Sequence, residues 1–196
     1  MKRFWVVAML CALCGCGESV ESNEPMGQDP APDLSQWEGA WVLPSRETWQ
    51  IEVVDPDQGE LSIVATEKAG GDEPDDAPRV TTVRAFVRRG GDRTYLSFEC
   101  VDEDCAAGDG PADAYLWAAA EMENGSVRVS VPRAEEFVKL LDQGLLQGYV
   151  NDGDVVLVSL EERHYRAIDD DAKTLFDAPM TLLTRVDATS AGGVAP

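Results

Sequence analysis

The sequence predicts a mainly β protein, an antiparallel β-barrel or sandwich of about eight to ten strands with two short helices. The first observation is a series of short runs in which apolar and polar side chains alternate, as in half-buried strands. The second is the turn residues between these runs, such as Asn124-Gly125, which favour two-residue hairpins. The third is that helix signals are confined to residues 133–141 and 160–168.

The chain begins with the layout of a secretory signal, MKRFWVVAMLCALCGC. Lys2 and Arg3 precede an apolar run over residues 4–13, and small residues follow before Cys16. The run is shorter than the roughly 18 apolar residues that a transmembrane helix needs. We therefore expect residues 1–15 to be a signal peptide that is removed from the mature chain.

Leu13-Cys14-Gly15-Cys16 resembles the lipobox of bacterial lipoproteins, although Cys14 stands where Ala or Ser is usual. The resemblance implies that Cys16 carries palmitate-type acyl chains and becomes the first mature residue, anchored in the membrane of a bacterial cell envelope. Gly17 rather than Asp follows Cys16. By the family's rule, this implies an outer-membrane location, on the periplasmic face or the surface, if the host has an outer membrane. A plain secretory signal, cleaved after a small residue, stays open as an alternative.

The segment after the signal is predicted to be an unstructured tether. Residues 17–33 contain three prolines, two glycines and five acids, and only Val20 and Met26 are larger apolar residues. Such a composition buries too little apolar surface to fold alone. We therefore expect the acylated Cys16 and a disordered tether over residues 16–33, a β-barrel-like domain over 34–187, and a loose tail over 188–196.

The charge balance is strongly acidic. Without the signal, 14 basic residues face 37 acidic ones, a net charge of −23. A field of this sign opposes binding to nucleic acid and keeps the domain soluble, and it also favours cationic partners. The 44% hydrophobic share is enough for one domain with a real core.

Cys100 and Cys105 are an even pair of cysteines within the predicted domain. In an oxidising compartment such a pair predicts a disulfide bond. The alternative is a redox-active dithiol. Asp102, Glu103 and Asp104 disfavour it, because negative neighbours raise a thiol pKa and deplete the reactive thiolate.

The expected strands follow one another along the domain, and the expected helices interrupt them near its end. The strands are residues 41–43, 49–54, 60–66, 80–88, 93–100, 114–121, 126–131, 145–150, 155–158 and 181–186. Pro132 precedes the first helix, and Gly144 ends it. Ser159 with Glu162 is typical of a capping box that begins the second helix. Residues 67–79 are expected to be a mobile loop.

Gly39-Ala40-Trp41 resembles the G-x-W signature of lipocalin-type barrels. The resemblance implies that the tryptophan closes one barrel end under an arginine of the last strand, for which Arg185 is the matching position. It also implies a small apolar ligand inside the barrel, but the two internal helices depart from a standard lipocalin. A looser resemblance to uncharacterised bacterial proteins covers residues 37–176. Without either resemblance, Trp41 is expected to be a core residue.

The sequence contains few signals of catalysis. His164 is the single histidine, which excludes multi-histidine metal sites, and we expect it to lie solvated on the second helix. The chain has no G-x-S-x-G elbow, phosphate loop or dinucleotide fingerprint. Residues 55–59 hint at a calcium loop, but they lack its glycine and distal glutamate, so we expect a turn. We therefore expect no catalytic residues, no cofactor and no metal ligands.

The functional hypothesis is a non-enzymatic, lipid-anchored envelope lipoprotein that serves as a structural or protein-interaction accessory. Its expected partners are the membrane, through lipid on Cys16, and another envelope protein. One alternative is a lipocalin-like carrier of a small apolar ligand. A hydrolase with a site of dispersed carboxylates also stays open, because the spacing of its acids is spatial rather than sequential.

Overall fold

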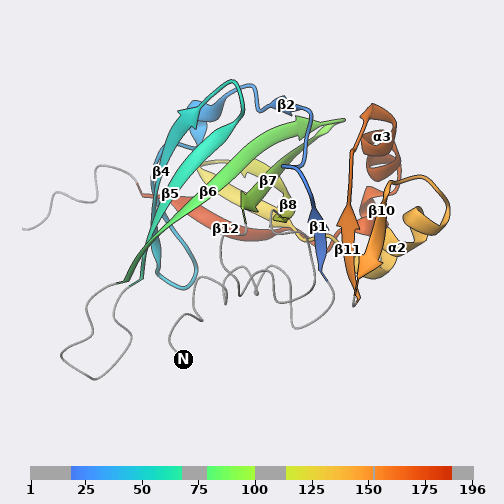
Figure 1. Ribbon diagram of the computed structural model, residues 1–196. Coiled ribbons are helices and arrows are strands. Elements are labelled where there is room, and N and C mark those ends of the chain that lie inside the picture. The colour runs from blue at the N-terminus through green and yellow to red at the C-terminus, as the bar shows by residue number, and fades with distance from the viewer. Residues whose placement is uncertain (1–18, 68–78, 100–113, 152, 187–196) are drawn as a thin grey trace, which may run out of the picture.

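The computed structural model describes residues 19–67, 79–99, 114–151 and 153–186 (Figure 1). The predicted signal peptide, Cys16, the pair Cys100 and Cys105, and the predicted tail over 188–196 lie outside the described residues.

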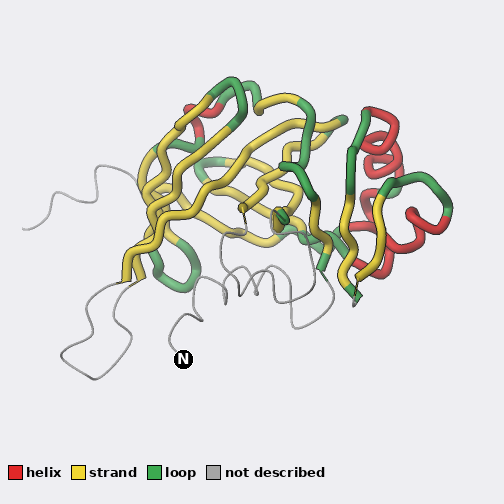
Figure 2. The backbone as a smooth tube through the Cα atoms, in the orientation of Figure 1, coloured by secondary structure: helices red, strands yellow, loops and turns green. Residues whose placement is uncertain are grey.

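Eight antiparallel strands close into a barrel (Figures 1 and 2). Their order around the barrel is β3-β4-β5-β6-β7-β8-β9-β12, and β12 pairs with β3 to complete the ring. These strands are β3 (Gly39–Val42), β4 (Thr48–Asp55), β5 (Glu60–Glu67), β6 (Arg79–Gly90), β7 (Arg93–Glu99), β8 (Tyr115–Glu123), β9 (Ser126–Ser130) and β12 (Met180–Arg185). The predicted mainly β fold is confirmed as a closed barrel, consistent with a lipocalin-like architecture.

Hairpin connections between neighbouring strands set the barrel's register. Asn124 and Gly125 have φ angles of 50° and 74°, the left-handed values that a two-residue hairpin turn requires. The turn places Glu123 opposite Ser126, so the last residue of β8 pairs with the first residue of β9. The hairpin predicted from Asn124-Gly125 is confirmed.

An apolar cluster of inward-facing side chains packs inside the barrel, and we call it the interior cluster. Trp41 is fully buried, and the rings of Trp49 and Phe98 meet edge to face with their centres 6.0 Å apart. Ile51 of β4 lies opposite Ile63 of β5, and both are 1% exposed. Alternation along each strand directs these residues inward, so burial of the cluster is the main stabilising contribution of the barrel.

Helices cover the outer face of β7 and β8, so these two strands are buried on both faces. They are α2 (Ala134–Asp142), α3 (Glu162–Asp170) and α4 (Ala172–Leu175), and they gather on one side of the barrel (Figure 1). Trp117 points outward from β8, with its ring centre 5.6 Å from that of Phe137 on α2. Two helices were predicted here, and the structure adds the short α4.

Three further strands extend the sheet beyond the barrel. β1 (Val20–Ser22) pairs in parallel with β11 (Asp154–Leu157), and β11 pairs with β10 (Gly148–Asn151). β1 also pairs with β8 at Leu116 and Tyr115, whereas β9 pairs with β8 only from Ala119 onward. The edge of β8 is thus shared between the barrel and the extension.

The prediction of a disordered tether over 16–33 is wrong for residues 19–33. β1, β2 (Asp29–Pro30) and the turns between them pack along the barrel, and Met26 is only 1% exposed. The Met26 N–H donates to Ser97 Oγ at 3.0 Å, and the Gly27 N–H donates to Tyr165 Oη at 2.8 Å. The polar composition did not predict this packing. Backbone groups of the segment bond to Ser97 and Tyr165, and its few apolar side chains are buried.

The start of the second predicted helix also differs from the expectation. Ser159 has a φ of 51° and lies before the helix, which begins at Glu162 after Glu161. The side chain that reaches back is His164, whose Nδ1 accepts the Glu161 N–H at 2.8 Å. A capping box exists here, but it is shifted by two residues because the chain makes a tight bend at Ser159.

Candidate functional site

One end of the barrel is closed by a tryptophan and an arginine. Trp41 on β3 lies opposite Arg185 on β12, and the guanidinium carbon is 4.9 Å from the centre of the indole ring. The indole Nε1 donates to the Trp37 carbonyl at 2.7 Å. The Arg185 guanidinium donates to the Glu38 carbonyl at 3.0 Å and to the Gln36 carbonyl. The arrangement that the G-x-W resemblance implied for Trp41 and Arg185 is confirmed.

The backbone conformation at Gly39 explains why this signature contains a glycine. Gly39 has a φ of 114°, a value that side chains with a Cβ rarely adopt. This backbone turns the chain from the helical turn η1 (Leu34–Gln36) into β3. The glycine therefore places Trp37 and Trp41 close enough for their hydrogen bond.

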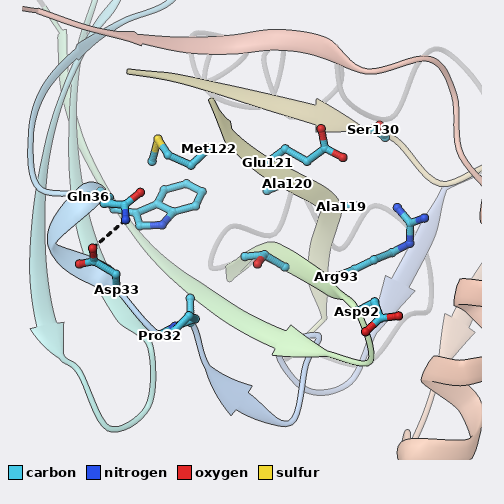
Figure 3. Close-up of a pocket in the computed structure, with 13 residues that line it drawn as sticks. Pro32, Asp33, Gln36, Asp92, Arg93, Ala119, Ala120, Glu121, Met122 and Ser130 are labelled. Atoms are coloured by element: carbon cyan, nitrogen blue, oxygen red, sulfur yellow. Dashed lines mark hydrogen bonds between the residues drawn. The ribbon is translucent and has the colours of Figure 1, made fainter. Parts of the chain in front are cut away.

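A pocket of about 470 Å³ lies beside this closure (Figure 3), and Trp37 is its aromatic lining residue. Its lining comes from residues 31–33, 36–37, 92–94, 119–122 and 130. Both faces of β8 contribute, because Ala120 and Met122 point inward whereas Ala119 and Glu121 point outward. The pocket therefore lies where β7 begins and where β8 continues past it toward its hairpin.

The wall of the pocket carries more acidic than basic groups. Asp33, Asp92 and Glu121 are its carboxylates. Hydrogen bonds from Ser35 (Oγ, 2.6 Å) and from Gln36 (Nε2, 2.7 Å) hold the pKa of Asp33 below its usual range. The pocket thus combines an aromatic wall with an acidic rim.

Arg93 lines the same pocket, but its charge is engaged elsewhere. Its Nε lies 3.1 Å from Asp169 Oδ1, and its guanidinium carbon is 5.4 Å from the centre of the Phe176 ring. Figure 3 shows this guanidinium pointing away from Asp33 and Gln36. Arg93 therefore fastens the β6–β7 turn to the helices rather than neutralising the acidic rim.

The prediction of a solvated His164 is wrong, since the side chain is only 2% exposed. Burial, with a smaller effect of Arg163, lowers the pKa of the imidazole, and Nδ1 is used as the acceptor for the Glu161 N–H. His164, Tyr165 and Ile168 are the buried residues of α3. Their helical spacing was the sequence signal that the expectation missed, and His164 has a structural role at the helix start.

The other sequence-predicted sites have mixed outcomes. Cys16, Cys100 and Cys105 lie outside the described residues. Residues 55–59 form the expected turn, in which Asp55 Oδ1 accepts the N–H groups of Asp57 and Gln58 at 3.0 and 3.3 Å. Within the described ranges, no three His, Cys, Asp or Glu side chains are grouped as a metal site would require.

No helix in the described part of the chain is both long and apolar enough to cross a bilayer.

The chain was compared with family models, with curated proteins and with solved structures, and no match was found in any of the three.

Proposed function

We propose that this chain is a lipid-anchored cell-envelope protein that acts without catalysis, as a structural or protein-interaction accessory. The observation that carries the proposal is the packed interior cluster, considered together with the lipobox-like junction at Cys16. Side chains of this cluster, such as Trp41, Ile51 and Ile63, lie in the part of the barrel where a lipocalin-like carrier would hold its ligand. Recognition would then take place on the outer surface, and the expected partner is another envelope protein.

The anchor itself is tested with Cys16→Ser in the full chain. Acylation requires the Cys16 sulfur and the mature amino terminus, so the variant should lose its acyl mass and leave the membrane fraction. Cys14→Ser is the matched control, because it places a usual lipobox residue beside an intact Cys16 and should remain membrane-bound. An unmodified Cys16 in the wild-type chain, measured by mass spectrometry of the mature amino-terminal peptide, would overturn the anchor.

A lipocalin-like carrier is the second candidate, and one observation favours it. The pocket beside Trp37 has a volume of about 470 Å³, within the range of small-molecule sites. Its acidic rim and aromatic wall suit a small ligand with an apolar body better than a long fatty chain. In this reading, the ligand would lie at the closed end rather than along the barrel axis.

Filling the pocket tests this candidate. Met122→Trp adds volume at the pocket wall, whereas Val54→Trp adds the same ring at a position that is 57% exposed and does not line the pocket. If the chain is a carrier, an apolar dye should bind to the wild type and to the Val54 variant but not to the Met122 variant. Equal dye binding by all three proteins, with no co-purified ligand in native mass spectra, would end the carrier reading.

A further inference from the structure

The described chain enters the fold beside the turn of the β10–β11 hairpin. The Ser19 N–H and Oγ both bond to Asp154 Oδ1, at 2.6 and 2.8 Å, and the Val155 N–H donates to the Ser19 carbonyl at 2.9 Å. Only three peptide units separate Ser19 from Cys16. Even a fully extended chain spans no more than roughly 11 Å over that distance. An acylated Cys16 would therefore hold this end of the domain at the membrane.

Two apolar side chains are exposed at the same end. Tyr149 is 46% exposed and Val150 is 49% exposed, both on β10, which is the last strand of the sheet. Val150 lies in one row with Val155 and Val20 across the three strands of the extension. Val150 therefore lies two strand spacings, or about 10 Å, from Val20. This distance is similar to the largest distance that can separate Cys16 from Ser19.

We infer that the β10–β11 hairpin rests on the lipid surface, with Tyr149 and Val150 at the membrane interface. The inference rests on the proposed lipid anchor at Cys16. The anchor fixes the position of the hairpin, and the two side chains supply the apolar contact. Tyrosine suits this depth because its ring is apolar and its hydroxyl stays among the headgroups.

The charge near the anchor indicates which lipids the hairpin accepts. Glu21 and Asp154 lie in the rows next to Val150, and the mature chain has a strongly negative charge. Anionic headgroups would repel these carboxylates over about a Debye length. The surface therefore fits a lipid layer with neutral or zwitterionic headgroups.

The test places the photo-crosslinking residue p-benzoylphenylalanine at Tyr149 in the full, processed chain. The matched control carries it at Val54, which is 57% exposed on β4, across the barrel from the extension. After illumination in phosphatidylcholine vesicles, the Tyr149 position should give at least tenfold more lipid adduct than the Val54 position. The adduct should decrease when phosphatidylglycerol replaces half of the lipid.

The same sample separates the two possible failures, because the mass of the mature amino-terminal peptide reports acylation of Cys16. A chain without acyl groups overturns the proposed anchor and the inference together. A chain with acylated Cys16 but equal adducts at both positions overturns the inference alone. So does a Tyr149 adduct to a second copy of the chain or to another protein, because the edge of β10 would then serve a partner strand.

Discussion

Arg185 and Trp41 are register partners on β12 and β3, and the guanidinium of the first covers the indole ring of the second at 4.9 Å. Through its bonds to the carbonyls of Gln36 and Glu38, the same guanidinium holds the chain that leads into β3. One side chain thus connects the last strand of the barrel, the first strand and the segment that closes its end.

Removing the Arg185 charge should weaken the closure. We expect Arg185→Gln to lower the free energy of unfolding by about 1–2 kcal/mol, because it loses the cation–π contact and the charged hydrogen bonds. Arg128→Gln is the control, since Arg128 forms a surface ion pair with Glu123 at 3.2 Å and should lose no more than about 1 kcal/mol. Urea denaturation measures both, and equal losses would contradict the special role of Arg185.

Two buried tyrosines should respond in opposite ways to loss of the hydroxyl. Tyr165 Oη accepts the Gly27 N–H, so Tyr165→Phe leaves a buried donor unpaired and should cost about 1–3 kcal/mol. Among the described residues, Tyr95 Oη has no hydrogen-bond partner, and burial raises the pKa of Tyr95 well above its usual range. Tyr95→Phe should therefore be neutral or stabilising. Thermal unfolding of the two variants tests the contrast, and a destabilised Tyr95→Phe protein would contradict it.

The stability of the fold should depend on the ionisation of His164. Burial lowers the pKa of His164 below its ordinary value of 6.5, so the folded chain binds this proton less tightly than the unfolded chain. Neutral His164 therefore contributes to the stability of the fold. This contribution is fully present above pH 6.5 and is lost as the pH falls through the lower pKa that His164 has in the folded chain. Stability should decline between about pH 7 and pH 5, and His164→Gln should flatten that part of the profile. Identical profiles for both proteins would show that other groups control this range.

The docking of residues 19–30 should depend on Gly27. An added Cβ at Gly27, where φ is 104°, would lie 2.7 Å from Arg88 Cβ. At Gly39 the φ is equally unfavourable, but an added Cβ would have no atom within 4 Å. We expect Gly39→Ala to cost about 1–3 kcal/mol through backbone strain alone. Gly27→Ala should also release the segment, which amide hydrogen exchange at Met26 would detect as loss of protection.

The sequence predicted the barrel strands well because most of them are joined by short turns with strong local signals. Asn124-Gly125 fixes both the turn type and the register, so local chemistry was sufficient there. The Trp41–Arg185 contact was predicted through a short family signature. Periodicity alone would have given only a buried Trp41.

The packed amino-terminal segment was missed for a physical reason. Its backbone forms hydrogen bonds to residues far along the chain, such as Ser97 and Tyr165. The composition of the segment does not indicate these long-range bonds. The pocket was not predicted either. Its wall combines residues 31–33 and 36–37 with β7, β8 and Ser130, and only the closed barrel brings these segments together.

The shared edge of β8 has a consequence for the order of assembly. β1 joins the fold between β8 and β11, and the Ser19–Asp154 bond links residues 135 positions apart. Ribosomes release the amino-terminal segment first, yet its docking site does not exist until β11 has been made. Such distant pairing forms slowly. The first residues of the domain can therefore dock only after most of the chain has been made.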